Sequence, residues 1–162
     1  LGLGITLQPS FLSSPLEPLS YLQEILGDRA LTGSPLKTFI RQNIPLSGGS
    51  DGPVTPPDPI EGISCCMEHP YDKTQALSME EALGMYTREI YHTTFDDDRG
   101  TLEAGKWADM VILDRNPMEN KTKEKAVQIQ VEQLILRGKP YKKGMSILGM
   151  IFHGLFGRKV TI

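Results

Sequence analysis

The residue best placed to do chemistry is Asp51, which follows a short apolar run and two glycines. Residues 44–46 have the composition of a buried strand, and Gly48 and Gly49 permit the backbone conformations with which a chain leaves a strand. A Pro-rich loop at residues 53–59 then restricts the outgoing chain. Barrel and open α/β enzymes keep reactive groups at the carboxyl ends of strands, so the pattern predicts a site. A plain surface turn is the alternative, because Gly, Ser, Asp and Pro are all common in turns.

The cysteines and histidines are weaker candidates for a reactive or metal-binding site than Asp51. Cys65 and Cys66 are adjacent, so they cannot link distant parts of a fold by disulfides. Thiolates could bind a metal, but we favour two small buried residues. Of the histidines, His92 falls late in an expected helix and is better explained by the helix dipole than by metal binding. His153 lies in an apolar segment, where a packed histidine is the simpler interpretation.

The elements that must position Asp51 begin with a strand at residues 3–7, ended at Pro9. A helix over about 16–26 follows, with Gly27 as its stop. Ser34-Pro35 is typical of an N-cap with Pro at the first helical position, and we expect Asn43 to end that second helix in a left-handed conformation. The order strand, helix, helix, strand favours a βα unit with parallel strands.

The middle of the chain is predicted to be helical. One helix is expected over 59–67, ending before Pro70. Ser78 and Glu81 have the spacing of a capping box, which opens the most regular helix of the chain, at roughly 79–95. A polar turn at residues 96–100 ends it.

After residue 100 the pattern changes to turns and short strands. We expect strands at 110–113 and 129–136, the second with a bulge near Gln133, and a hairpin-like turn into a short strand around Tyr141. We interpret Trp107 with Asp109 as shaping a turn of this part. The change in composition predicts a boundary near residue 100.

Composition excludes several functional classes. Acidic residues outnumber basic ones by 20 to 17 among 162 residues, which disfavours a general nucleic-acid binder. No apolar run is long enough to span a bilayer, and the cysteine usage suits a reducing cytoplasm. The chain starts inside an apolar run without an initiator Met, from which we infer a fragment that lacks its N-terminal part.

Residues 145–156 form an unusual apolar segment, with basic residues on both sides. Its apolar positions fall on one face of a helix, although the segment is too short to cross a membrane. We favour a terminal helix that docks on the body of the protein or on a second copy. A helix lying on a membrane surface is the alternative, and the few charges on its polar face disfavour it.

Taken together, these motifs resemble the C-terminal part of a metal-dependent amidohydrolase of the exoenzyme-regulatory-type and N-substituted formamide deformylase-like branch. The resemblance covers about residues 3–142, and the order and spacing of its four motifs make it specific. The motifs are Leu7-Gln8-Pro9-Ser10-Phe11; Gly49-Ser50-Asp51-Gly52-Pro53-Val54 with Pro56-Pro57-Asp58-Pro59; Ser78 to Ala82 with Tyr86-Thr87; and Gly100 to Asp109 with Val111-Ile112-Leu113-Asp114 and Asn116-Pro117.

The resemblance implies an α/β plus β fold. Residues 1–99 would be the C-terminal portion of a (β/α)₈ barrel, containing strands seven and eight. Residues 100–143 would be the C-terminal share of a small β-sandwich. Residues 144–162 lie outside the resemblance, and from their apolar pattern we expect a tail helix. Two barrel strands alone would expose edges, so we expect the chain to form a homo-oligomer or rearrange.

The resemblance also implies a chemistry. Asp51 matches the family's acid after strand eight, which binds a divalent metal, zinc being our choice, and handles the proton of the attacking water. Gln8 and Arg29 would contact a small amide substrate. The family's histidine ligands lie on earlier strands, and His69, His92 and His153 match none of them. We therefore expect this fragment to hold no catalytic metal and to be inactive alone. The alternative is a non-catalytic binding or assembly module that uses the apolar C-terminal helix.

Overall fold

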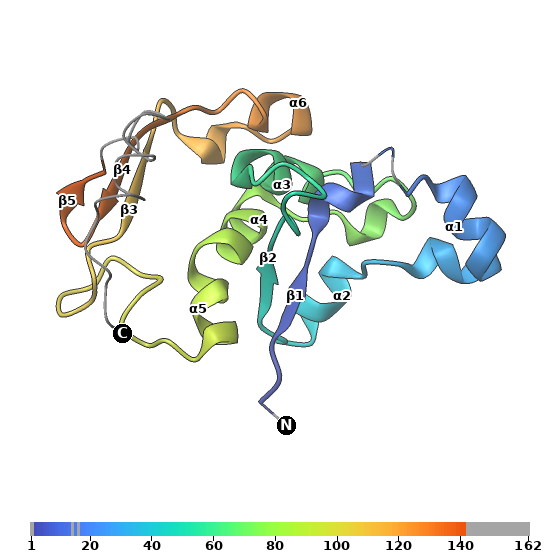
Figure 1. Ribbon diagram of the computed structural model, residues 1–162, viewed down its shortest axis with the longest axis horizontal. Coiled ribbons are helices and arrows are strands. Elements are labelled where there is room, and N and C mark those ends of the chain that lie inside the picture. The colour runs from blue at the N-terminus through green and yellow to red at the C-terminus, as the bar shows by residue number, and fades with distance from the viewer. Residues whose placement is uncertain (1, 14, 16, 142–162) are drawn as a thin grey trace, which may run out of the picture.

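The computed structural model describes residues 2–13, 15 and 17–141 (Figure 1). The tail predicted at residues 145–156 lies outside them. Short helices cover the first part of the chain and an antiparallel sheet follows. In chain order the elements are β1 (Ile5–Leu7), α1 (Leu19–Leu26), α2 (Leu36–Arg41), β2 (Leu46–Gly48), α3 (Pro59–Cys66), α4 (Met79–Tyr86), α5 (Arg88–Thr94), β3 (Met110–Leu113), α6 (Lys123–Ala126), β4 (Val131–Leu136) and β5 (Lys139–Pro140). Short 3-10 helices cover Pro9–Ser13, Gly27–Thr32, Lys73–Gln75 and Pro117–Glu119.

Strands β1 and β2 pair in parallel, as the predicted βα unit requires. Ile5 lies opposite Leu46 and Leu7 opposite Gly48, while the chain between the strands passes through α1 and α2. The second strand starts later than predicted, because Pro45 has no N–H to donate and only its carbonyl joins the pairing, accepting from the amide of Ile5. Gly48 is the last residue of the strand.

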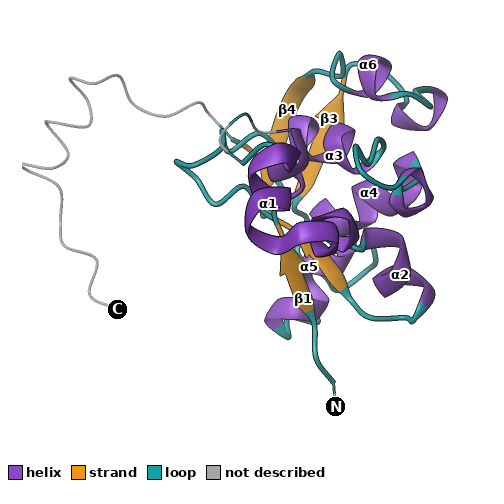
Figure 2. Ribbon diagram, turned by 90° about the vertical axis from the view of Figure 1, so that its right-hand side faces the viewer, coloured by secondary structure: helices purple, strands orange, loops and turns teal. Residues whose placement is uncertain are grey.

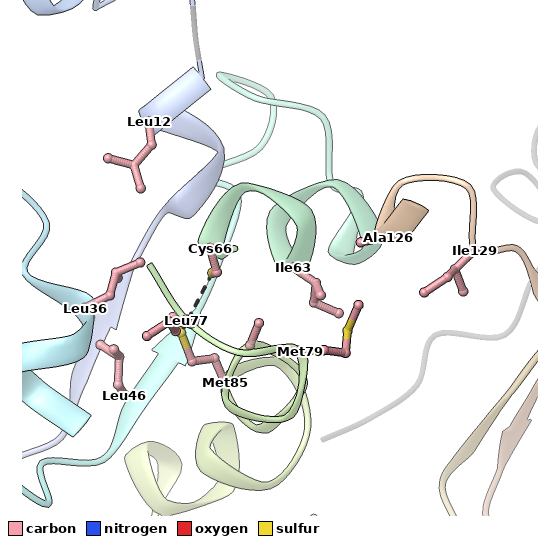
Figure 3. Close-up of a cluster of buried hydrophobic side chains, with 11 residues drawn as sticks. Leu12, Leu36, Leu46, Ile63, Cys66, Leu77, Met79, Met85, Ala126 and Ile129 are labelled. Atoms are coloured by element: carbon pink, nitrogen blue, oxygen red, sulfur yellow. Dashed lines mark hydrogen bonds between the residues drawn. The ribbon is translucent and has the colours of Figure 1, made fainter. Parts of the chain in front are cut away.

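The hydrophobic core lies between β2 and the helices α2, α3 and α4 (Figure 3). Leu36 of α2 is fully buried, and Leu46 and Met85 are 1% exposed. Ala126 and Ile129 belong to the same cluster, although they come from beyond the predicted boundary at residue 100. Figures 1 and 2 show α6 beside α3, at the end of the molecule where β3 and β4 lie. The cluster consists of Leu12, Leu36, Leu46, Ile63, Cys66, Leu77, Met79, Ala82, Met85, Ala126 and Ile129.

Two helix predictions need correction. The helix expected over 79–95 is two helices, α4 and α5, which meet at Thr87. The Thr87 hydroxyl donates to the carbonyl of Leu83 at 2.7 Å, the kind of local bond that competes with a continuing helix. The N-cap position of α2 is Pro35 and not Ser34, and the apolar Pro35 side chain makes no capping bond. Ser34 stands one residue before that position, with a φ of 52°. The ends assigned to Gly27 and Asn43 are confirmed, since both have positive φ.

The later strands form an antiparallel sheet in the order β3-β4-β5. Its register shifts between Ile112 and Leu113, where Gln133 and Val131 are the partners, so the bulge predicted near Gln133 is confirmed. The Asp109 carboxylate accepts from the amide of Arg137 at 2.7 Å and steadies the hairpin turn. No helix within the described residues is long and apolar enough to cross a membrane. The assignment of these elements to barrel strands and to half of a sandwich stays a prediction.

Candidate active site at the carboxyl ends of two parallel strands

Asp51 lies three residues beyond β2, on an exposed turn with a φ of 53°. Its own carbonyl accepts from the amide of Val54 at 2.9 Å. The turn is braced by Ser50, whose Oγ accepts from the amide of Gly52 at 3.2 Å. Among the described residues no hydrogen bond or ion pair engages the Asp51 carboxylate. That carboxylate is therefore presented to solvent at the end of a buried strand.

Gln8 follows β1 directly and is half-buried. Because β1 and β2 run parallel, their carboxyl ends meet at one edge, and the amide of Gly49 donates to the carbonyl of Leu7 at 2.8 Å there. The backbone carbonyl of Gln8 accepts from Phe11 at 3.0 Å and starts the 3-10 helix over Pro9–Ser13. Gln8 and Asp51 thus follow neighbouring strand ends, as the sequence predicted.

Arg29 occupies a separate position. It is exposed in the 3-10 helix over Gly27–Thr32 and lines a small pocket of about 150 Å³ with Phe11, Leu12 and Tyr71. Phe11 and Leu12 belong to the segment that continues from Gln8, so this pocket adjoins the strand-end side of β1. In the described part of the chain, no hydrogen bond joins Arg29 to Gln8 or Asp51 through their side chains.

A larger pocket, of about 370 Å³, lies elsewhere among the described residues. It forms around the start of β2, where Asn43 and Pro45 meet Glu81, Arg88 and His92 from α4 and α5. Asp51, Gln8 and Arg29 do not line it. Since reactive groups in this architecture sit at the carboxyl ends of strands, we place the site at Asp51 rather than in the larger pocket.

The described residues contain no group of three or more His, Cys, Asp or Glu side chains that could hold a metal ion. His69 is buried with both ring nitrogens engaged, because Nδ1 accepts from the amide of Asp72 at 3.0 Å and Nε2 lies 3.2 Å from the carbonyl of Ser34. Cys65 and Cys66 are buried, as predicted, and burial raises the pKa of the Cys66 thiol, which disfavours the thiolate. A carboxylate oxygen is a ligand that divalent ions accept, so the chemistry of the exposed Asp51 side chain fits that of a single metal ligand.

Sequence reasoning missed two residues that hold the site loop. Asp58 caps α3, since its Oδ1 accepts from the amides of Ile60 at 2.9 Å and Glu61 at 3.3 Å. An Asp followed by Pro is a usable signal for a helix start, and here Pro59 is the first helical residue. Thr55 is buried and donates its hydroxyl hydrogen to the carbonyl of Ser50. No sequence motif predicts this contact.

Known proteins match this chain over most of its length. Two curated relatives are the Bacillus subtilis strain 168 protein named "Putative amidohydrolase YtcJ", 30% identical over 128 residues, and the N-substituted formamide deformylase of Arthrobacter pascens, 29% identical over 97 residues. These alignments cover 72% and 56% of this chain but 24% and 18% of the relatives. The chain therefore spans about a quarter or less of the curated relatives it matches.

Two solved structures are also similar to this chain. A crystal structure of an uncharacterized metal-dependent hydrolase from Pyrococcus furiosus is 29% identical, with a TM-score of 0.62, over 70% of this chain and 24% of that one. A second, of an uncharacterized protein, is 19% identical with a TM-score of 0.55 over 88% of this chain and 36% of that one, and its likeness is one of fold. The Amidohydrolase family model matches residues 1–141. The chain belongs to the amidohydrolase family.

Proposed function

We propose that this chain is the C-terminal part of a metal-dependent amidohydrolase that hydrolyses a carbon–nitrogen bond other than a peptide bond, with Asp51 in its active site. The observation that carries the proposal is the exposed carboxylate of Asp51 at the shared carboxyl edge of β1 and β2. Membership of the amidohydrolase family supports the reaction class, and the named metal-dependent hydrolase of similar fold supports a divalent metal.

Asp51 has two tasks in this proposal. One carboxylate oxygen would be a ligand of the metal, for which we propose zinc; when bound, such an ion lowers the pKa of its water to about 7. The carboxylate also accepts a proton from the attacking water and gives it to the leaving nitrogen, so the amide becomes an acid and an amine. Gln8, at the neighbouring strand end, and Arg29, at the small pocket, would contact the substrate.

We propose that the remaining ligands come from another part of a longer parent protein, since this chain spans about a quarter or less of its curated relatives. We propose histidines on strands that this chain does not contain. The substrate is a small amide, and an N-substituted formamide is the first class to try, given the name of one relative. We also propose a cytoplasmic setting and, for the isolated chain, no catalytic metal and no activity.

The test uses the full-length gene product. Asp51→Asn keeps the size of the side chain and its tolerance for a positive φ, but removes the charge. We expect bound zinc to be lost and turnover of N-alkylformamides, followed by amine release, to fall by about 10²–10⁴-fold. Asp97→Asn, which changes another exposed aspartate, is the control and should change neither quantity.

If Asp51→Asn kept full zinc content and full turnover, the proposed role of Asp51 would be wrong. If the full-length protein bound no divalent metal, the assembly module would be the better interpretation of the chain. Metal analysis of the purified 162-residue chain supplies a third check. A stoichiometric ion held through Asp51 in that chain would contradict the shared ligand set.

A further inference from the structure

The loop that carries Asp51 has a single anchor in the protein interior. From Asp51 to Pro59, all of which the structure describes, every residue is exposed except Thr55, which is 4% exposed. A buried hydroxyl needs a hydrogen-bond partner. Thr55 finds it in the backbone carbonyl of Ser50, to which its Oγ1 donates. The anchor of the loop therefore acts on the peptide group that immediately precedes Asp51.

This contact determines where the Asp51 side chain points. The carbonyl of Ser50 and the amide of Asp51 share one rigid peptide plane, which Thr55 holds. The next plane contains the carbonyl of Asp51, which accepts from Val54, and the amide of Gly52, which donates to Ser50 Oγ. With both flanking planes held, the φ and ψ angles of Asp51 are set, and so is the direction of its Cα–Cβ bond.

The conformation so held is an uncommon one. Asp51 has a φ of 53°, a region that favours glycine, although aspartate tolerates it better than most residues. Three glycines lie within three residues of it, at positions 48, 49 and 52, and none of them has a positive φ. The loop thus places its left-handed turn on the carboxylate residue instead of on a glycine. Strained backbone of this kind persists where the surroundings over-determine it, and it gathers at functional sites.

We propose that Thr55 is a positioning residue for Asp51: its buried hydroxyl holds the Ser50 carbonyl and thereby fixes the Cα–Cβ direction from which the Asp51 carboxylate would reach a metal. Ser50 supports the same geometry through its side chain. The inference rests on the proposed function, since it assigns Thr55 a role only through Asp51. Partners that orient a metal ligand typically change metal affinity or activity by about 10- to 100-fold when they are removed.

The experiment compares Thr55→Val and Thr55→Ser in the full-length gene product. Valine keeps the shape and removes the donor, whereas serine keeps the donor. Zinc affinity is measured by competition with a chromophoric chelator, alongside kcat and KM for an N-alkylformamide and the melting temperature of the metal-free protein. We expect Thr55→Val to weaken zinc binding by about 10- to 100-fold and to lower kcat with KM little changed. Thr55→Ser should restore both.

Thr94→Val is the matched control, because the Thr94 hydroxyl also donates to a backbone carbonyl, that of Ile90 at 3.2 Å, but in α5. It should leave zinc affinity unchanged. A Thr55→Val protein that melts lower yet binds zinc with wild-type affinity would overturn the positioning role. If Thr55→Val does not fold, the comparison of Thr55→Ala with Thr55→Ser decides in the same way, because only serine keeps the hydroxyl donor. Asp51→Asn separates the two ideas, since unchanged zinc binding in that variant would refute the proposed function itself.

Discussion

Glu81 shows how one residue joins local and distant contacts. It completes the capping box of α4, accepting from the amide of Ser78 at 2.8 Å while Ser78 Oγ accepts from the amide of Glu81 at 3.2 Å. It also pairs with Lys37, 44 positions away in α2. Burial raises the pKa of Glu81, but the hydrogen bonds from Lys37 and Ser78 outweigh it and leave the pKa below its usual value.

The pH dependence follows from that direction. A depressed folded-state pKa stabilises the fold above the unfolded-state value of about 4.3, and the contribution is lost as pH falls through the folded-state pKa. Glu81→Gln keeps the capping box but removes the charge. We expect it to lower the free energy of unfolding by about 0.5–1 kcal/mol at pH 7 and by nothing measurable near pH 2. Urea unfolding at the two pH values measures both numbers.

Glu80→Gln is the control for that experiment, since Glu80 is exposed in the same turn. Glu80→Gln should lower the free energy of unfolding at pH 7 by less than Glu81→Gln does. An undiminished loss for Glu81→Gln near pH 2 would mean that the charge of Glu81 is not what stabilises the fold.

Residue-scale features were predictable where the partners are close in sequence. The capping box of Ser78 and Glu81 spans three residues, and Asn43 ends α2 through bonds to Ile40 at 2.9 Å and, from the next residue, to Phe39 at 3.1 Å. Both motifs can be predicted from the types and spacing of neighbouring residues. Two contacts were not predicted: the ion pair of Glu81 with Lys37, and the hydrogen bond of Thr55 with the carbonyl of Ser50. Neither long-range pairing nor the closure of a loop produces a periodic pattern in the sequence.

Among the elements, the packing of α3 and α4 on β2 depends on one aromatic ring. Tyr86, at the end of α4, lies against Gly48 of β2 and Gly62 of α3, and a Cβ at either glycine would overlap the ring. Burial is the main cause that raises the pKa of the Tyr86 hydroxyl. The two glycines are therefore needed for their lack of a side chain and not for an unusual φ.

Two alanine substitutions in neighbouring helices should have opposite effects. Gly62→Ala places a methyl group on the Tyr86 hydroxyl and should lower the free energy of unfolding by about 1–3 kcal/mol. Gly84→Ala in α4 meets nothing closer than the Arg88 guanidinium at 3.6 Å and should raise it by up to about 1 kcal/mol, since alanine favours a helix. Chemical denaturation of both variants makes the comparison. A tolerated Gly62→Ala would show that Tyr86 does not occupy this position.

Element boundaries were predicted less well than element types. The strands at 110–113 and in the region 129–136, and the helix beginning at Met79, agree with the structure because their apolar periodicity is clear. The break at Thr87 was missed, since the stripe that includes Tyr86 and Ile90 continues across it. Only the hydrogen bond from Thr87 to Leu83 and the packing of each half show where the helix divides.

On the scale of the whole molecule, the parallel pair is incompletely covered. Helices cover Leu46 on one face of β2, whereas Thr6 and Leu3 of the β1 region are exposed, Leu3 at 69%. Within the described residues, β1 pairs only with β2. Parallel sheets are normally buried, and an open edge invites pairing with another strand.

We therefore expect the isolated 162-residue chain to self-associate. Light scattering at increasing protein concentration should show a dimer or larger species, and the melting temperature should rise with concentration. Leu3→Lys puts a charge beside the exposed edge and should shift the chain toward monomer without lowering its stability. A clean monomer at high concentration would contradict the expectation.

The sequence by itself determined the family, the βα unit with its parallel strands, the capping box of Ser78 and Glu81, and the place of Asp51 after a strand. These features depend on residue types a few positions apart, and such patterns can be recognised in the sequence without knowledge of the fold. Tertiary structure alone decided that Thr55 holds the peptide before Asp51, that Tyr86 fills the space over Gly48 and Gly62, and that Ala126 joins the core. The Tyr86 and Ala126 contacts form when packing brings together residues far apart in the chain, and the Thr55 contact forms when the loop closes on itself, so no periodic pattern of residue types predicts them.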